Sequence, residues 1–215
     1  RKMIAKLYDA KYSIREIKRF VYADKQYVRE TAAYRHLIHN RLQQYIPKFY
    51  GSWSASILDN AGGQRRSVRM ILTEYVVGTD MVHLRPEAFS QHRRMEIMRQ
   101  VLKAESRFYA CNLRHMDLFP RNVMITEESV RAGGALHIVI IDFGLACLFR
   151  SPEDVYRGHD SQLLEGRYIS PILRWWHPLG QRDDWTLSRW IDWNWNRWLI
   201  RTFEKDLPDI TPEMR

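Results

Sequence analysis

The sequence predicts an α+β fold in which a small, strand-rich part is followed by a larger and mainly helical part. Three observations lead to this prediction. Up to about Val77 the pattern reads strand, helix, strand, strand. A long amphipathic helix then follows over 86–110. The final fifth of the 215 residues is rich in tryptophan and belongs to the helical part.

The elements of the first part follow from their apolar spacing. Residues 2–8 form a short apolar run around Lys6 and predict a strand. From 24 to 42 apolar residues recur every three or four positions, which predicts a helix. One face of that helix is expected to carry Tyr27, Thr31, Tyr34 and Ile38. A second strand is expected to start at Tyr50, and a third to span 67–77 after a turn at 60–63.

The second part begins with the long helix. Its spacing places four residues on one face: Ile97, Val101, Ala104 and Phe108. Two short apolar strands, 122–126 and 137–142, read as a hairpin with a turn containing Gly133 and Gly134. Residues 149–166 are polar and irregular. Buried packing is the favoured role of the tryptophans, and a stacking surface for sugars or bases is the alternative.

Composition excludes several classes of protein. With 45% hydrophobic and 27% charged residues, the chain is neither disordered nor fibrous. Its longest apolar stretch, 136–149, is interrupted by Asp142 and is too short to span a membrane. The net charge of +9 comes from scattered basic residues, which does not favour nucleic-acid binding. Two unpaired cysteines, Cys111 and Cys147, favour a reducing compartment, the cytoplasm or nucleus. Cys147 is expected to fill a small buried space.

Two short motifs carry the chemistry. His115-Met-Asp-Leu-Phe-Pro-Arg-Asn122 follows the long helix, and Ile141-Asp-Phe-Gly144 ends the next strand. An aspartate with an asparagine five residues later, then a second aspartate before a glycine turn, is the pattern that phosphoryl transfer requires. Asp117 would orient the attacking hydroxyl and accept its proton, while Asn122 and Asp142 would hold Mg²⁺. Gly144 is expected to let the chain turn sharply.

With these motifs the sequence resembles the protein-kinase superfamily over about residues 3–188. The resemblance implies one two-lobed, kinase-like domain over 1–215 that uses ATP and Mg²⁺. Its small lobe would span 1–77, its hinge 78–81 and its large lobe 82–215. Lys6 resembles the lysine that contacts the nucleotide phosphates, and Glu30 resembles the partner of that lysine.

The resemblance also assigns a nucleotide pocket and two supporting residues. Thr73 would lie at its back, the backbone of Glu74, Tyr75 and Val76 would bind adenine, and Asp80 would reach the ribose. Arg121 would supply positive charge near the transferred phosphoryl group, as in tyrosine kinases. His115 is expected to tie its loop to the Asp-Phe-Gly turn.

Several departures make this a divergent and shortened member, of the kind found in fungal genomes. Because only five residues precede Lys6, either this sequence starts after the glycine-rich loop over the phosphates or the protein lacks that loop. The large lobe is expected to be truncated. Four positions differ from the family pattern: Ile4 replaces an alanine, Met116 an arginine, Phe119 a lysine, and Ile172 a glutamate.

The expected function is transfer of the γ-phosphate of ATP to a Ser or Thr hydroxyl of an unidentified protein. Two alternatives stay open. The absent glycine-rich loop, Phe119, Ile172 and the short large lobe would also suit an inactive pseudokinase that serves as a nucleotide-binding scaffold. A small-molecule kinase of the aminoglycoside or choline type is the other alternative, although Met116 and Phe119 do not match the motif of those enzymes. The sequence makes no prediction of oligomeric state.

Overall fold

A computed structural model describes residues 2–9, 19–58, 63, 65–130, 134–148, 169–176 and 187–212. The irregular segment expected at 149–166 lies outside these residues, as do Gly133, most of the turn at 60–63 and Trp185. Among the described residues, no helix is both long and apolar enough to cross a membrane.

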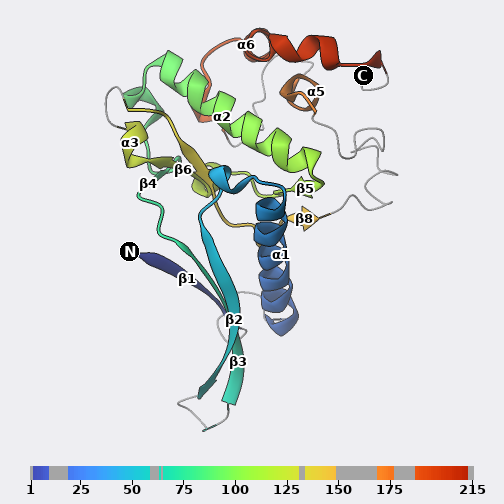
Figure 1. Cartoon of the computed structure of the whole chain (residues 1–215). Coiled ribbons are helices and arrows are strands. Elements are labelled where there is room, and N and C mark those ends of the chain that lie inside the picture. Colours follow the sequence, from blue (N-terminus) through green and yellow to red (C-terminus); the bar gives the residue numbers. More distant parts are fainter. Residues whose placement is uncertain are drawn as a thin grey trace.

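The first part of the chain forms a three-stranded antiparallel sheet beside one long helix (Figure 1). Its strands are β1 (Met3–Tyr8), β2 (Phe49–Leu58) and β3 (Arg65–Glu74), in the order β1-β3-β2. Because side chains alternate along a strand, Lys6 and Tyr8 share one face of β1. Both contact helix α1 (Arg19–His39), which places β1 and α1 around the site described below.

Helix α1 differs from its prediction at both ends and on its buried face. It begins five residues earlier than expected, and it ends at His39 rather than at residue 42. Ile38 was expected on the same face as Thr31 and Tyr34, but it is 40% exposed whereas those two residues are buried. Leu37 is fully buried instead, because it lies seven residues after the buried Glu30 and so recurs on the same helical face.

A second sheet lies under the central helix. It contains β4 (Gly78–Asp80), β6 (Val123–Thr126) and β7 (Ile138–Ile140), in the order β4-β6-β7. The expected pairing of the last two strands is present, but the short helix α3 (Glu127–Val130) follows β6 directly. The expected hinge at 78–81 coincides with β4, while 75–77 carry no regular structure. A lobe boundary at this point stays a prediction.

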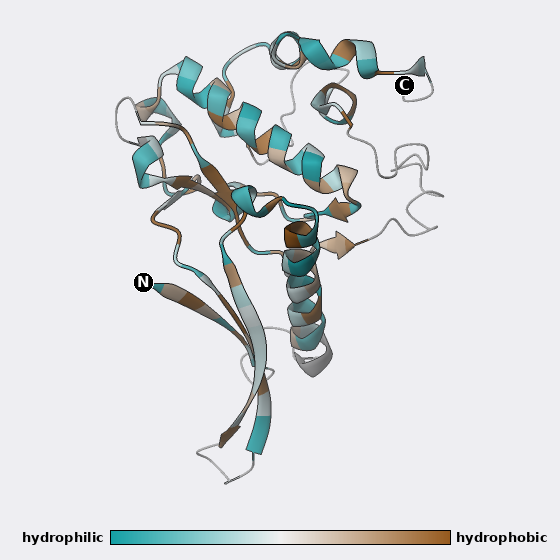
Figure 2. Cartoon of the chain, in the orientation of Figure 1, coloured by the Kyte–Doolittle hydropathy of each residue, from teal (hydrophilic) through white to brown (hydrophobic). Residues whose placement is uncertain are grey.

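The central helix α2 spans Gln91–Ala110 and is preceded by the short 3-10 helix η3 (Pro86–Ala88). It starts later than expected because the Ser90 hydroxyl accepts a hydrogen bond from the Arg93 backbone N–H, an N-cap. The four residues expected on its buried face are at most 1% exposed. In Figure 2, α2 alternates hydrophilic and hydrophobic residues, whereas the strands beneath it are mainly hydrophobic.

The remaining elements are short. They are η2 (Gln43–Tyr45), β5 (Leu113–Arg114), η4 (Pro120–Asn122), β8 (Cys147–Leu148), α5 (Pro171–Trp175), η6 (Ser188–Trp190), α6 (Trp195–Thr202) and η7 (Glu204–Asp209). Strands β5 and β8 pair with each other, which leaves Cys147 half-buried rather than enclosed.

The tryptophan-rich segment packs against α2. Trp190 and Trp195 are each 2% exposed and belong to the main hydrophobic core, which confirms packing for these two rings. The guanidinium of Arg174 in α5 contacts the carboxylate of Glu105 in α2 at 2.5 Å. The indole N–H of Trp175 donates to the same carboxylate, so α5 is fixed to the central helix by charge as well as by apolar contact.

Candidate functional site

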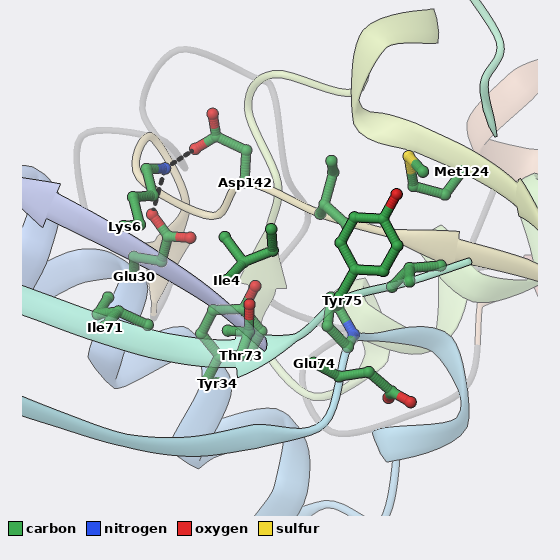
Figure 3. A pocket seen from close by; sticks show the side chains of 13 residues that line it. Ile4, Lys6, Glu30, Tyr34, Ile71, Thr73, Glu74, Tyr75, Met124 and Asp142 are labelled. Atoms are coloured by element: carbon green, nitrogen blue, oxygen red, sulfur yellow. Dashed lines mark hydrogen bonds and ion pairs between the residues drawn. The ribbon is translucent and has the colours of Figure 1, made fainter. Parts of the chain in front are cut away.

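A cavity of about 330 Å³ lies between the first sheet and the strands of the second. Its lining residues come from segments far apart in the sequence: Ile4, Lys6, Glu30, Tyr34, Pro47, Ile71, Thr73, Glu74, Tyr75, Val76, Met124, Ile141 and Asp142. Most of the exposed lining is apolar, but one end is charged. In Figure 3, Glu30 and Asp142 meet Lys6 at that end, and Tyr75 and Met124 lie at the other.

Lys6 joins two carboxylates from distant parts of the chain. Its Nζ lies 2.7 Å from Oε2 of Glu30 in α1 and 2.6 Å from Oδ1 of Asp142, just after β7. Glu30 is almost completely buried, whereas the side chain of Asp142 is 46% exposed. The buried carboxylate thus fixes the lysine, and the exposed one faces the open side of the site.

The charges of this group depend on one another. Burial by itself lowers the pKa of Lys6, but Glu30 and Asp142 outweigh it and raise that pKa above its ordinary value. Burial also raises the pKa of Glu30, against the opposing effects of Lys6 and Tyr8. Burial by itself raises the pKa of Asp142, but the charge of Lys6 and the hydrogen bonds from Lys6 and the Gly144 backbone together outweigh it, so the pKa falls below its ordinary value. Lys6 is therefore a cation and Asp142 an anion at neutral pH.

The sharp turn after β7 is made by Asp142 rather than by Gly144, which corrects the expectation from sequence. Asp142 has a φ of 61°, in the left-handed region, and Gly144 has no positive φ. Gly144 is needed instead because two carboxylate groups lie close to its backbone. A Cβ at this position would lie 3.3 Å from Oδ1 of Asp142 and 3.5 Å from Oε2 of Glu30. The absence of a side chain here keeps the two carboxylates close to Lys6.

The loop before β6 holds its polar residues together through Asp117. Arg121 contacts Oδ1 of Asp117 at 2.6 Å, and the amide nitrogen of Asn122 donates to Oδ2 at 2.9 Å. The same nitrogen donates to the backbone carbonyl of Asp117 at 2.8 Å. Arg121 also lies over the ring of Phe119, with its Cζ 4.4 Å from the ring centre. The carboxylate of Asp117 is thereby fixed on both oxygens.

Two hydrogen bonds join this loop to the turn after β7. The backbone N–H of Ile141 donates to the carbonyl of Asn122 at 2.9 Å, and Nε2 of His115 lies 2.9 Å from the carbonyl of Ile141. Because a carbonyl accepts, His115 donates through Nε2. The expectation that His115 ties the two segments together is confirmed. Asn122 and Asp142 consequently stand on adjoining backbone segments.

A series of aromatic contacts links the loop to the first sheet. His115 contacts Phe143 with ring centres 4.8 Å apart, and Phe143 contacts Tyr34 at 5.4 Å. Tyr34 stacks on Phe49 at 5.1 Å. These rings are mostly buried, so the charged end of the cavity rests on a packed base.

Comparisons with known proteins show the family of this chain. The protein kinase domain family matches residues 1–185. The chain belongs to this family. Serine/threonine-protein kinase 17A of Oryctolagus cuniculus is 26% identical over 127 residues, which cover 57% of this chain and 30% of that protein. This chain therefore aligns with less than a third of that relative's length.

Not every residue assigned to this kinase domain by sequence lies in the cavity. Thr73, Glu74, Tyr75 and Val76 line it, together with Lys6 and Glu30. Asp80 does not line it. Its Oδ1 accepts hydrogen bonds from the backbone N–H groups of Val82 and His83 and contacts the His83 ring, so it caps the turn after β4. Binding of the ribose by Asp80 stays a prediction.

The kinase domain also has site residues that sequence reasoning missed. Met124 and Tyr34 line the cavity, and Tyr8 hydrogen-bonds Glu30. Tyr34 follows Glu30 by four residues, so helical spacing was an available signal. Tyr8 follows Lys6 by two residues, so strand alternation was another. Met124 gave no such signal, because it is an ordinary apolar residue of a short strand.

Protonation of His115 is expected to destabilise the fold. The backbone N–H of Asp117 donates to Nδ1 at 3.3 Å, so the ring is neutral. Burial lowers its pKa. The unfolded chain therefore binds the proton more readily, and stability is lost as pH falls below about 6.5, with a slope of at most about 1.4 kcal/mol per pH unit. Urea unfolding at pH 7.5, 6.5 and 5.5 should show this loss in the wild type.

The His115→Gln variant is the control for the other histidines. The unfolding free energy of His115→Gln should depend less on pH than that of the wild type. The gap between the unfolding free energies of the two proteins should therefore narrow as the pH falls. A gap between the unfolding free energies of the wild type and His115→Gln that is the same at all three pH values would contradict the prediction.

Proposed function

We propose that this kinase domain transfers the γ-phosphate of ATP, with Mg²⁺, to a serine or threonine hydroxyl of a protein. One observation carries the proposal. Lys6, Glu30 and Asp142 meet at the charged end of a cavity whose other end is apolar. A nucleotide has the same division, since its base is flat and largely apolar and its phosphates are anionic.

The cavity would take the adenine at its apolar end. Its volume of about 330 Å³ lies at the lower limit of typical small-molecule sites. Ile4 and Met124 line it from β1 and β6, and residues 74–76 line it where β3 ends. The ammonium group of Lys6 would then contact the phosphates, and Glu30 would hold that group in place.

The residues assigned to Mg²⁺ fit a hard cation. Asp142 is an exposed, ionised carboxylate, and the described hydrogen bonds of the Asn122 side chain use its nitrogen and not its oxygen. Mg²⁺ takes hard oxygen ligands, chiefly one or two carboxylates with phosphate and water oxygens, and in protein kinases an asparagine joins an aspartate in holding it. When bound, Mg²⁺ neutralises charge that develops on the phosphates.

The transfer step would centre on Asp117. The hydroxyl oxygen of the acceptor attacks the γ-phosphorus, the bond from that phosphorus to the β–γ bridging oxygen breaks, and ADP leaves. The carboxylate of Asp117 accepts the hydroxyl proton. Arg121 and Asn122 hold that carboxylate, and the charge of Arg121 would also stabilise the transferred group. The name of the matched relative supports serine and threonine as acceptors.

Nucleotide binding tests this proposal most directly. ATP with Mg²⁺ at a hundredfold excess over the dissociation constant stabilises a protein by about 2.7 kcal/mol. For a chain of this size the unfolding midpoint should rise by about 5–10 °C. The rise should require Mg²⁺ and should disappear in Asp142→Asn, which lacks the anionic metal ligand.

An exposed acidic residue away from the cavity supplies the control. Asp192→Asn should keep the full rise, because Asp192 contacts Arg94 and does not line the cavity. A wild-type midpoint that ATP and Mg²⁺ leave unchanged would refute the nucleotide site.

A further inference from the structure

Tyr8 contacts both members of the Lys6–Glu30 ion pair, although the transfer step proposed above gives it no task. It is the last residue of β1 and is 6% exposed. Its hydroxyl donates a hydrogen bond to Oε2 of Glu30, the same oxygen that accepts from Lys6. The Nζ of Lys6 lies 5.5 Å from the centre of the Tyr8 ring. Tyr8 is therefore placed to affect the lysine directly and through the carboxylate.

Packing fixes the ring of Tyr8. Tyr8 pairs with Arg69 of β3 in the sheet register. Its ring meets that of Tyr27 in α1 edge to face, with centres 5.7 Å apart. The guanidinium of Arg69 covers Tyr27, with its Cζ 5.4 Å from the ring centre. A ring held by both the sheet and the helix directs its hydroxyl at Glu30 without a large loss of side-chain entropy.

Glu30 needs a donor besides Lys6. Glu30 is 2% exposed, and a buried carboxylate is costly unless donors satisfy it. The ammonium group of Lys6 donates to both Glu30, at 2.7 Å, and Asp142, at 2.6 Å. In the proposed function Lys6 must also contact the phosphates. A neutral donor on the rigid strand can hold Glu30 while Lys6 turns toward the nucleotide.

We propose that Tyr8 is a positioning residue of the nucleotide site, whose hydroxyl fixes the Glu30 carboxylate so that Glu30 can orient Lys6. This inference rests on the proposed function, because that function assigns Lys6 to the phosphates. It adds a residue that belongs neither to the cavity lining nor to the catalytic loop.

A double-mutant cycle tests the role of the hydroxyl. The dissociation constant of ATP with Mg²⁺ is measured by calorimetry for the wild type, Tyr8→Phe, Glu30→Gln and the double variant. Tyr8→Phe should weaken binding roughly five- to tenfold, which is less than the full effect of one lost hydrogen bond to a charged group because the hydroxyl reaches the nucleotide only through Glu30 and Lys6. In the Glu30→Gln background the same change should cost much less, because the hydroxyl acts through the carboxylate.

Tyr27→Phe is the matched control, because it removes a hydroxyl from the neighbouring ring and leaves the contacts of Glu30 intact. It should bind ATP as the wild type does. Urea unfolding without nucleotide gives the folded fraction of each variant, to which the affinity is corrected. An unchanged affinity in Tyr8→Phe, or an equal loss in both backgrounds, would overturn the proposal.

A measurement without nucleotide separates this proposal from the proposed function. In a ¹⁵N-lysine-labelled protein the ammonium resonance of Lys6 reports its surroundings, and Tyr8→Phe should move it while Tyr27→Phe should not. A resonance that stays in place in Tyr8→Phe overturns the role of Tyr8. If the wild type binds no ATP, the proposed function fails, and the resonance alone decides whether Tyr8 positions Lys6.

Discussion

Replacing Asp117 with asparagine is expected to lower the rate of phosphoryl transfer by roughly 10²–10⁴-fold, the usual contribution of a general base. An amide of the same shape can still accept a hydrogen bond from Arg121, but it cannot take up the proton of the acceptor hydroxyl. Transfer of ³²P from labelled ATP to a peptide library would measure the rate. The affinity for ATP should stay within about twofold, because Asp117 does not line the cavity.

The control must keep the same chemistry at another position. Asp192 forms a 2.6 Å ion pair with Arg94, much as Asp117 does with Arg121. Asp192→Asn should transfer phosphate at the wild-type rate. If Asp117→Asn and the wild type incorporate phosphate equally, then Asp117 is not the base and the measured activity comes from elsewhere.

Replacing Gly78 with alanine is expected to destabilise the protein by about 3 kcal/mol, the upper range for overpacking. A Cβ at this position would overlap the carbonyl oxygen of Ile125 and lie 2.9 Å from Cα of Thr126. Both are backbone atoms of β6, the strand that pairs with β4, so neither can move aside as a flexible side chain would. Urea unfolding of the purified variant would measure the loss.

Val77→Ala is the neighbouring control, because Val77 is exposed and its truncation should change the unfolding free energy by about 0.5 kcal/mol or less. Gly78→Ala should also weaken ATP binding, since β4 follows the segment 74–76 that lines the cavity. A Gly78→Ala variant as stable as the wild type would show that β4 and β6 can separate without cost.

The element types were predictable from sequence where apolar spacing is regular. The buried face of α2 was identified correctly, because the apolar side of an amphipathic helix is the side that packs against the core. The start of α2 was not, although a serine before an apolar repeat is a known N-cap signal. In α1, apolar spacing alone did not identify Ile38 as exposed. The sheet that packs against α1 determines where the buried face of this helix ends.

The polar residues of the candidate site could be proposed from sequence because the chemistry of phosphoryl transfer restricts residue type and order. Two short motifs contain Asp117, Asn122 and Asp142. Lys6 and Glu30 were proposed as site residues because they precede these motifs in the expected order. Their mutual distances were not predictable, since Lys6 and Asp142 are 136 positions apart in the chain.

By itself, then, the sequence predicted the strands and helix of the first part, the central helix and the family, and it singled out the polar residues of the candidate site. Tertiary structure alone decided that Tyr8 shares the carboxylate of Glu30, that Met124 lines the cavity and that Asp80 caps a turn instead. The physical reason is that strand alternation places Tyr8 on the face of Lys6 without identifying its partner, and that methionine and aspartate are common residues without restrictive local patterns. Their roles depend on which distant backbone segments pack beside them, and that is settled only when the whole chain buries its core.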